Sequence, residues 1–228
     1  MQLDFTPEQD ELRDSVRTML TNECPMALVR EVFEKGTRPD ALWAHMVELG
    51  WPALTVPEAA GGLGLGAVEL AVVVEELGRA MAPGPFLATV TQFAAVVREV
   101  GDDAQRHRFL GAVAAGETTG ALAIAEGPGS FDPAQVTATA TTDGDDVVLT
   151  GTKHFVLDGA AADEVVVVAR APRTTGDDGL GAYVVARSQL AAEPIATLDR
   201  SRPIATVALD HVRVPRDRVL GVPGEASA

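Results

Sequence analysis

The spacing of apolar residues changes once along this chain, near Gly116 and Glu117, and that change limits the folds open to it. Before this point, apolar residues recur every three or four positions, which is the period of an α-helix. After it, short runs rich in β-branched residues are separated by Gly, Asp and Pro, which is typical of strands. Helices first and strands second predict an α+β protein rather than one that alternates strands with helices.

The first half carries clear helix signals. Thr6, Pro7 and Gln9 form the pattern of an N-cap, a proline at the first helical position and a capping-box partner. Gly or Pro stands at most of the later breaks between periodic segments. We predict six helices, over residues 7–21, 25–35, 40–49, 67–81, 87–100 and 102–115.

The second half predicts the strands of a β-barrel or sandwich. Its apolar runs are "TGALAIA", "VTATATT", "DVVLTG", "HFVLD", "EVVVVAR", "AYVVAR" and "IATVALDHVRV". A chain of 228 residues fits one large domain or two smaller ones. We expect two: an N-terminal helical domain at residues 1–117 and a β-domain at residues 118–228.

Composition excludes several classes of protein. With 33 acidic against 18 basic side chains, the formal charge of -15 repels a phosphate backbone, so we expect no nucleic acid partner. The single cysteine, Cys24, forms no internal disulfide, and no 18-residue apolar run or signal peptide is present, so we expect no membrane span and a cytoplasmic protein. The four histidines lie far apart, so we expect no metal site.

A glycine-rich segment imitates a dinucleotide-binding motif. Gly62, Gly64 and Ala67 satisfy the spacing of that fingerprint, and a predicted helix follows. However, Pro57 interrupts the strand that should precede the glycines, and no second strand ending in Asp or Glu comes about 20 residues later. We therefore interpret the segment as a tight connector between helices.

Five regions, in this order along the chain, resemble those of the acyl-CoA dehydrogenases. They are "LDFTPEQDELRDSVRTML", "PEAAGGLGLG" with the helix end "EELGRAMAPGP", "ALAIAEGPGSFD", "VVLTGTKHFVLDGA" and "LDHVRVPRDRVLG". The resemblance covers residues 2–222 and implies a helical domain and a middle β-domain that hold FAD and an acyl-CoA thioester. Members of the family also have a C-terminal four-helix domain, for which we expect no counterpart in this chain.

The resemblance implies that two segments contact the flavin. "HFVLD" takes the place of the family's W-I-T-N, and a flat ring such as that of Phe155 suits stacking on a flavin. "ALAIAEGPGSFD" takes the place of A-x-T-E-P-x-A-G-S-D, whose backbone N–H groups would reach the ring. The expected cofactor-binding residues are Leu122, Ala123, Ile124, Gly129, Ser130, Phe155, Val156 and Leu157. The alternative is that residues 155–157 fill the core of the β-domain.

Two departures from the family pattern weaken this site. Where the family places threonine hydroxyls near the flavin, this chain has Ile124 and Leu157, which donate no hydrogen bond. Ser130 matches the serine of G-S-D, so we expect it near the pantetheine or pyrophosphate of a bound acyl-CoA substrate. Its alternative role is a local hydrogen bond within a turn.

The reaction that the resemblance implies is α,β-dehydrogenation of an acyl-CoA, in which a carboxylate removes the α-proton and hydride leaves the β-carbon for the flavin. In the family, that carboxylate belongs to the C-terminal domain, so we assign no catalytic residue to this chain. The chain does contain other carboxylates, but we expect each of them on a solvated helix face or turn. They are Glu69, Glu75, Glu76, Glu126 and Asp158.

Three functions remain open at this point. The first is an FAD-dependent acyl-CoA dehydrogenase subunit or fragment, an oxidoreductase of fatty acid or steroid degradation. The second is a non-catalytic structural or regulatory subunit of a heteromeric acyl-CoA dehydrogenase, which the missing hydroxyls at positions 124 and 157 favour. The third is a flavin monooxygenase on the same fold. The expected partners are an acyl-CoA thioester, a homo- or hetero-oligomer with another such subunit, and an electron-transfer flavoprotein.

Overall fold

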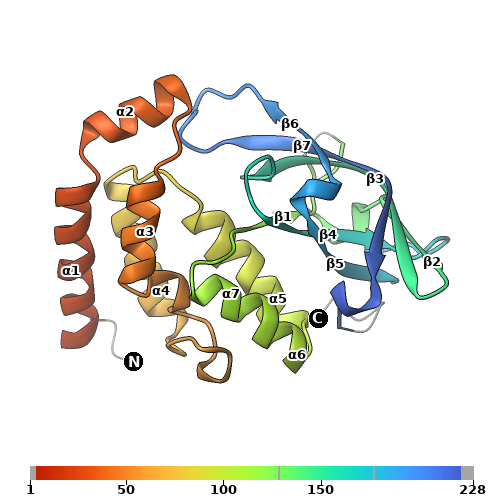
Figure 1. Cartoon of the computed structure of the whole chain (residues 1–228), viewed down its shortest axis with the longest axis horizontal. Coiled ribbons are helices and arrows are strands. Elements are labelled where there is room, and N and C mark those ends of the chain that lie inside the picture. The colour runs from red at the N-terminus through yellow and green to blue at the C-terminus, as the bar shows by residue number, and fades with distance from the viewer. Residues whose placement is uncertain (1–3, 128, 177, 222–228) are drawn as a thin grey trace.

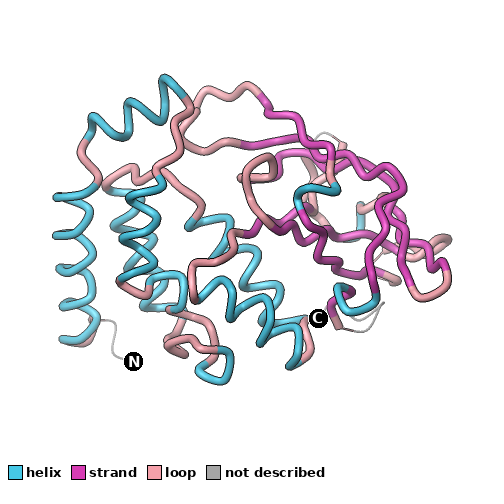
Figure 2. Tube along the Cα trace, in the orientation of Figure 1, coloured by secondary structure: helices cyan, strands magenta, loops and turns pink. Residues whose placement is uncertain are grey.

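The computed structural model describes residues 4–127, 129–176 and 178–221. Figure 1 shows the helices gathered in one half of the molecule and the strands in the other, with α5 and α7 between them. Figure 2 shows the same division by type of secondary structure. The predicted α+β order is therefore confirmed.

Six helical segments form the first half, as predicted. They are α1 (Pro7–Glu23), α2 (Met26–Lys35), α3 (Asp40–Glu48), α4 (Ala67–Arg79), a π-helical turn (Leu87–Phe93) that leads into α5 (Ala94–Val100), and α6 (Asp103–Gln105), which continues through a second π-helical turn (Arg106–Leu110) into α7 (Gly111–Ala114). The predicted capping box of α1 is present, because the Gln9 N–H donates to Thr6 Oγ1 and the Thr6 N–H donates to Gln9 Oε1.

The glycine-rich connector is not a dinucleotide site. It consists of two short 3-10 turns, Trp51–Ala53 and Glu58–Ala60, with no strand in front of the glycines. A Cβ atom at Gly62 would lie 2.0 Å from the carbonyl oxygen of Val56, so the chain needs glycine there to fold back on itself. None of the helices in the described residues is long and apolar enough to span a membrane.

The strands form one sheet in the order β6-β7-β3-β2-β4-β5-β8, with β1 also paired to β4. They are β1 (Gly120–Ala123), β2 (Thr139–Asp143), β3 (Asp146–Leu157), β4 (Glu164–Arg170), β5 (Leu180–Ala186), β6 (Ala191–Ile195), β7 (Ile204–Pro215) and β8 (Val219–Leu220). The predicted runs "DVVLTG" and "HFVLD" are parts of the single strand β3. The strands β6 and β8 were not predicted, because they are short and lack an apolar run.

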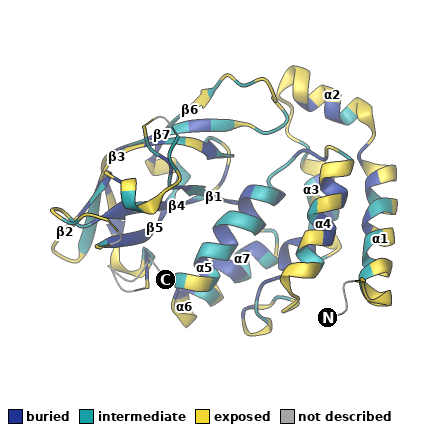
Figure 3. Cartoon of the chain, turned by 180° about the vertical axis from the view of Figure 1, so that it is seen from behind, coloured by how far each residue is buried: buried dark blue, intermediate teal, exposed yellow. Residues whose placement is uncertain are grey.

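Two cores lie on opposite faces of β1, β4 and β5. Alternation along β4 sends Val165 and Val167 into the core between strands and Val166 into the core shared with the helices. Phe93, Val97 and Leu110 pack against that second face. Figure 3 shows the result: β4 and β5 are mostly buried, whereas α2 is largely exposed.

An ion-pair cluster joins α1 to α4. Glu76, which we expected on a solvated helix face, is in fact 1% exposed. Arg17 holds its carboxylate with two hydrogen bonds of 2.6 and 3.0 Å, and Arg79 adds a third of 3.0 Å. The hydrogen bond from Arg17 outweighs desolvation and, with Arg79, lowers the pKa of Glu76 to about 2 from its ordinary value of 4.5.

We expect Glu76→Gln to lower the free energy of unfolding at pH 7 by about 2 kcal/mol, an amount discounted for the partial exposure of Arg17. Because the pKa is lower in the folded state, the stabilisation is complete above pH 4.5 and is lost as the pH falls toward 2. Urea unfolding of both proteins from pH 7 to pH 3 checks this. The exposed Glu75 serves as the matched control, and a Glu76 effect that is independent of pH would contradict the assignment.

Candidate functional site

The two predicted flavin-contacting segments lie side by side. The His154 N–H donates to the carbonyl oxygen of Ala125 over 2.9 Å. The ammonium group of Lys153 donates to the carbonyl oxygen of Ile124 over 3.1 Å. A Cβ atom at Gly129 would lie 3.0 Å from the ring of Phe155, so this ring covers the glycine closely. One surface patch therefore contains residues of both segments.

A β-bulge orients Phe155. The pairing of β3 with β7 shifts between Lys153 and Val156, so that two residues of β3 oppose one residue of β7. Phe155 adopts the left-handed backbone conformation, with φ of 56°, which is strained for a bulky residue. Its ring is 40% exposed rather than buried in the core. The bulge thus presents a flat aromatic surface outside the sheet.

A buried ion pair supports the patch from behind. Lys153 is completely buried, and its ammonium lies 2.5 Å from a carboxylate oxygen of Glu126. The same carboxylate accepts the backbone N–H groups of Thr137 and Ala138 over 2.8 and 3.0 Å. Burial raises the pKa of Glu126, but these hydrogen bonds outweigh it and hold the pKa below its ordinary value. Burial lowers the pKa of Lys153, and Glu126 only partly offsets this. Glu126 is therefore an anchoring group rather than a solvated one.

The remaining predicted residues divide into two groups. Ala123 and Val156 are buried in the β-core, so only their backbone faces the patch. Four others are half-buried: Leu122, whose side chain packs against the core shared with the helices, and Ile124, Ser130 and Leu157. The hydroxyl oxygen of Ser130 accepts the backbone N–H of Asp132 over 3.2 Å, which is the local turn contact that the sequence allowed.

These residues offer an exposed aromatic ring, apolar side chains and backbone, and this surface suits a flat, largely apolar ring system. Because Ile124 and Leu157 lack hydroxyl groups, the hydrogen bonds to such a ring system would come from the backbone and from Ser130. Within the described ranges, no cluster of three or more His, Cys, Asp or Glu side chains could bind a metal ion.

Asp158 is a further buried carboxylate, although we expected it in solvent. It is 8% exposed and adopts the left-handed conformation, with φ of 54°. Its N–H donates to the carbonyl oxygen of Pro203 over 2.8 Å. Burial raises the pKa of Asp158 to about 6, against the opposing charges of Arg202 and Arg38. The sequence gives no signal that Asp158 is buried, because the groups that cover it come from segments distant in the chain.

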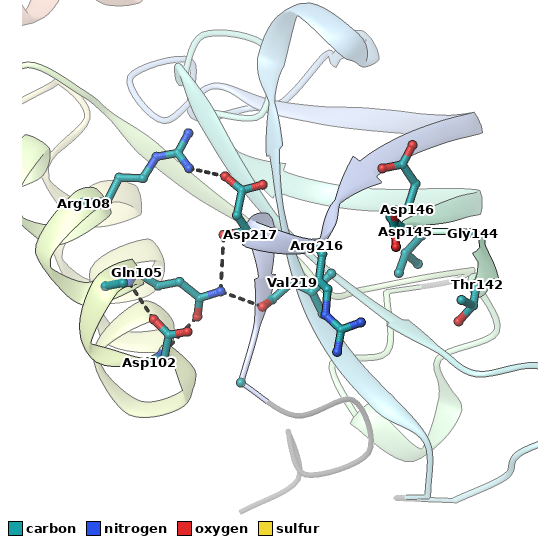
Figure 4. Close-up of a pocket in the computed structure, with 13 residues that line it drawn as sticks. Asp102, Gln105, Arg108, Thr142, Gly144, Asp145, Asp146, Arg216, Asp217 and Val219 are labelled. Atoms are coloured by element: carbon teal, nitrogen blue, oxygen red, sulfur yellow. Dashed lines mark hydrogen bonds and ion pairs between the residues drawn. The ribbon is translucent and has the colours of Figure 1, made fainter.

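A large open cleft of about 730 Å³ lies elsewhere, between α6, the β2–β3 hairpin and the turn before β8. In Figure 4, hydrogen bonds and an ion pair join Asp102, Gln105, Arg108 and Asp217, whereas Thr142, Asp145 and Arg216 are drawn without one. Gln105 donates to the carbonyl oxygens of Val219 and Asp217, and Arg108 contacts the Asp217 carboxylate over 2.6 Å. None of the predicted site residues lines this cleft, so we do not assign the site to it.

Comparison with known proteins gives the same family for sequence and fold. Residues 6–117 match the family model for the N-terminal domain of acyl-CoA dehydrogenases. The chain is 33% identical over 183 residues to the acyl-CoA dehydrogenase FadE26 of Mycobacterium tuberculosis, an alignment that covers 77% of this chain and 46% of that protein.

Solved structures share the fold over nearly the whole chain. The ChsE4–ChsE5 complex from Mycobacterium tuberculosis matches with a TM-score of 0.85 and 28% identity, covering 100% of this chain and 59% of that one. A variant of the Tcur3481–Tcur3483 steroid ACAD matches with a TM-score of 0.82 and 32% identity, covering 96% and 58%. The chain spans about half the length of the curated relatives that it matches.

Proposed function

The chain belongs to the acyl-CoA dehydrogenase family through its domain at residues 6–117, and we propose that it is the flavin-binding part of an FAD-dependent acyl-CoA dehydrogenase subunit. The observation that carries the proposal is the patch where residues 122–126 meet residues 153–157, with Phe155 held outside the sheet by a bulge. A strained, exposed aromatic residue beside a glycine suits a planar ligand.

FAD, when bound, would accept a hydride from the β-carbon of an acyl-CoA thioester. The ring of Phe155 would lie against the flavin, and the half-buried Ile124 and Leu157 would keep water away from it. The backbone of residues 122–126 would supply hydrogen bonds, held in place by the Lys153–Glu126 pair.

We propose that the carboxylate that removes the α-proton lies outside this chain. Glu76 and Glu126 are both held in ion pairs, and each would have to break its pair to accept a proton. The role of this chain would then be to bind and orient the flavin and the thioester, with Ser130 near the polar part of the acyl-CoA. The segment 83–94 would form part of the acyl pocket wall.

The proposed substrates are bulky acyl-CoA thioesters such as those of steroid side chains. Support comes from the similarity to the steroid ACAD, which is 32% identical to this chain. The similarity to one chain of the ChsE4–ChsE5 complex supports assembly with a second subunit of the same family. We further propose that the protein acts in the cytoplasm and passes electrons to an electron-transfer flavoprotein.

The second candidate function is a non-catalytic subunit that stabilises a catalytic partner without binding flavin itself. The absence of side-chain hydroxyls at positions 124 and 157 favours it, because two hydrogen bonds to the ring would be lost.

A visible absorption spectrum of the purified full-length protein separates the two candidates. Our proposal predicts flavin bands, either from the protein alone or from its complex with a partner subunit, and bleaching of those bands by an acyl-CoA substrate under anaerobic conditions. Flavin bands from the protein alone would exclude the non-catalytic candidate. A complex whose flavin content is fully accounted for by the partner would contradict our proposal.

Leu157→Thr is expected to tighten flavin binding by roughly fivefold, because the new hydroxyl can donate one hydrogen bond to the ring. Titration with FAD, followed by absorption or by quenching of flavin fluorescence, gives the dissociation constants. Val147→Thr introduces the same hydroxyl on the same strand, β3, away from the patch, and should leave the dissociation constants unchanged. An unchanged constant for Leu157→Thr would count against placing β3 on the ring.

A further inference from the structure

A smaller, more enclosed cavity of about 220 Å³ lies between the helical half and the β half, apart from the patch at Phe155. Its walls come from α2, the turn between α2 and α3, the segment before the first π-helical turn, and the loops that follow β3 and β6. The apolar part of the wall includes Val32, Trp43, Pro85 and Pro203. The cavity is thus lined by residues of both halves, and most of its surface is apolar.

Asp158 is the buried carboxylate in this wall. Its side chain is 8% exposed, and within the described part of the chain its carboxylate makes no hydrogen bond or salt bridge. Buried carboxylates in proteins are normally paired or hydrogen-bonded, because a charge without a partner is costly to desolvate. A carboxylate that lines a cavity and has no partner indicates that a hydrogen-bond donor from outside the chain completes it.

The charges around the cavity restrict what that donor can be. Arg38 and Asp40 face it from the α2–α3 turn and Arg200 from the loop after β6, while Arg202 acts on Asp158 from the same loop. A cationic ligand would meet these guanidinium groups, and an anionic ligand would meet the carboxylate of Asp158. Thr119 also lines the cavity, but its hydroxyl donates to Asp163 over 2.7 Å and not to Asp158. A neutral donor remains, and a hydroxyl group is the smallest organic group that supplies one.

We propose that this cavity binds a neutral hydroxyl group on an apolar body and that Asp158 accepts its hydrogen bond. The hydroxyl can belong to a free small molecule or to the far end of an acyl chain. The second source rests on the proposed function, whereas the first does not.

Saturation-transfer NMR on the full-length protein tests the site without flavin or acyl-CoA. The probes are cyclohexanol, which donates a hydrogen bond, and cyclohexanone, which only accepts one. At pH 8, where Asp158 is ionised, cyclohexanol should bind about tenfold more tightly than cyclohexanone. At pH 5, where the carboxyl group carries a proton, this preference should shrink.

Asp158→Asn should also reduce the preference, because an amide both donates and accepts. Asparagine tolerates the left-handed backbone at this position, so the variant should fold. Asp145→Asn makes the same change of charge at an exposed hairpin site and should keep the preference. Equal binding of alcohol and ketone by the wild-type protein at pH 8 would overturn the proposal, and so would an unchanged preference in Asp158→Asn.

Competition identifies the source of the hydroxyl. If the end of an acyl chain occupies the cavity, ω-hydroxylauroyl-CoA should displace cyclohexanol more effectively than lauroyl-CoA does. If a free molecule occupies it, cyclohexanol should bind alongside both thioesters. Either result agrees with a hydroxyl-binding cavity at Asp158. Failure of both thioesters to bind would count against the proposed function alone.

Discussion

Replacing Lys153 with methionine is expected to lower the free energy of unfolding by about 3–5 kcal/mol. Methionine has a similar length, so the packing changes little, but Glu126 loses its partner in a site that is almost closed to water. Removing one member of a buried pair is costly because the other charge stays behind without compensation. Urea unfolding at pH 7, with the midpoint and the slope fitted separately, measures the loss.

Two further variants isolate the cause of the loss. Lys35→Met removes an exposed partner of Glu31, and we expect a change of less than about 0.5 kcal/mol. The double variant Lys153→Met with Glu126→Gln should recover a large part of the loss, because no unpaired charge remains. A Lys153→Met protein as stable as the wild type would show that the pair does not anchor these segments.

Gly120→Ala is expected to lower the free energy of unfolding by about 3 kcal/mol through overpacking. A Cβ atom at Gly120 would lie 2.1 Å from the ring of Phe93, which is itself fully buried. The N–H of Gly120 also donates to the buried hydroxyl of Thr89 over 3.0 Å, so β1 cannot move away without breaking that bond. Gly120 is therefore the position where β1 packs directly against the helical half.

The matched control for this variant is Gly78→Ala in α4. Nothing lies within 4 Å of a Cβ atom there, and alanine favours a helix over glycine by up to about 1 kcal/mol. We therefore expect a neutral or stabilising change at Gly78 and a loss at Gly120, both measured by urea unfolding. Recovery of stability when Phe93→Leu is added to Gly120→Ala would identify the ring as the cause, and a stable Gly120→Ala protein would refute the close contact.

Local signals were sufficient to predict the helices and most strands. Thr6, Pro7 and Gln9 determine the start of α1 through contacts within three residues, and these contacts can be recognised in a sequence. The short strands β6 and β8 form because β7 and β5 offer them hydrogen-bonding edges. Such pairing depends on the tertiary structure, and the sequences of these two strands contain no apolar alternation that predicts it.

The buried charges could not be predicted in the same way. Glu76 pairs with Arg17 across 59 positions and Glu126 with Lys153 across 27, so no local pattern distinguishes them from solvated acids. The left-handed conformation of Phe155 was equally hidden, because it arises from a bulge in the β3–β7 pairing and not from a glycine. The motifs identified the segments of the candidate site, but tertiary pairing determines how they meet.

Hydrogen–deuterium exchange with and without FAD tests most directly whether a flavin binds where residues 122–126 meet residues 153–157. Our account predicts slower amide exchange in both segments when FAD is present, and no change in the hairpin that borders the large cleft at Thr142 and Asp146. Slower exchange at that cleft with unchanged rates in the two segments would contradict it.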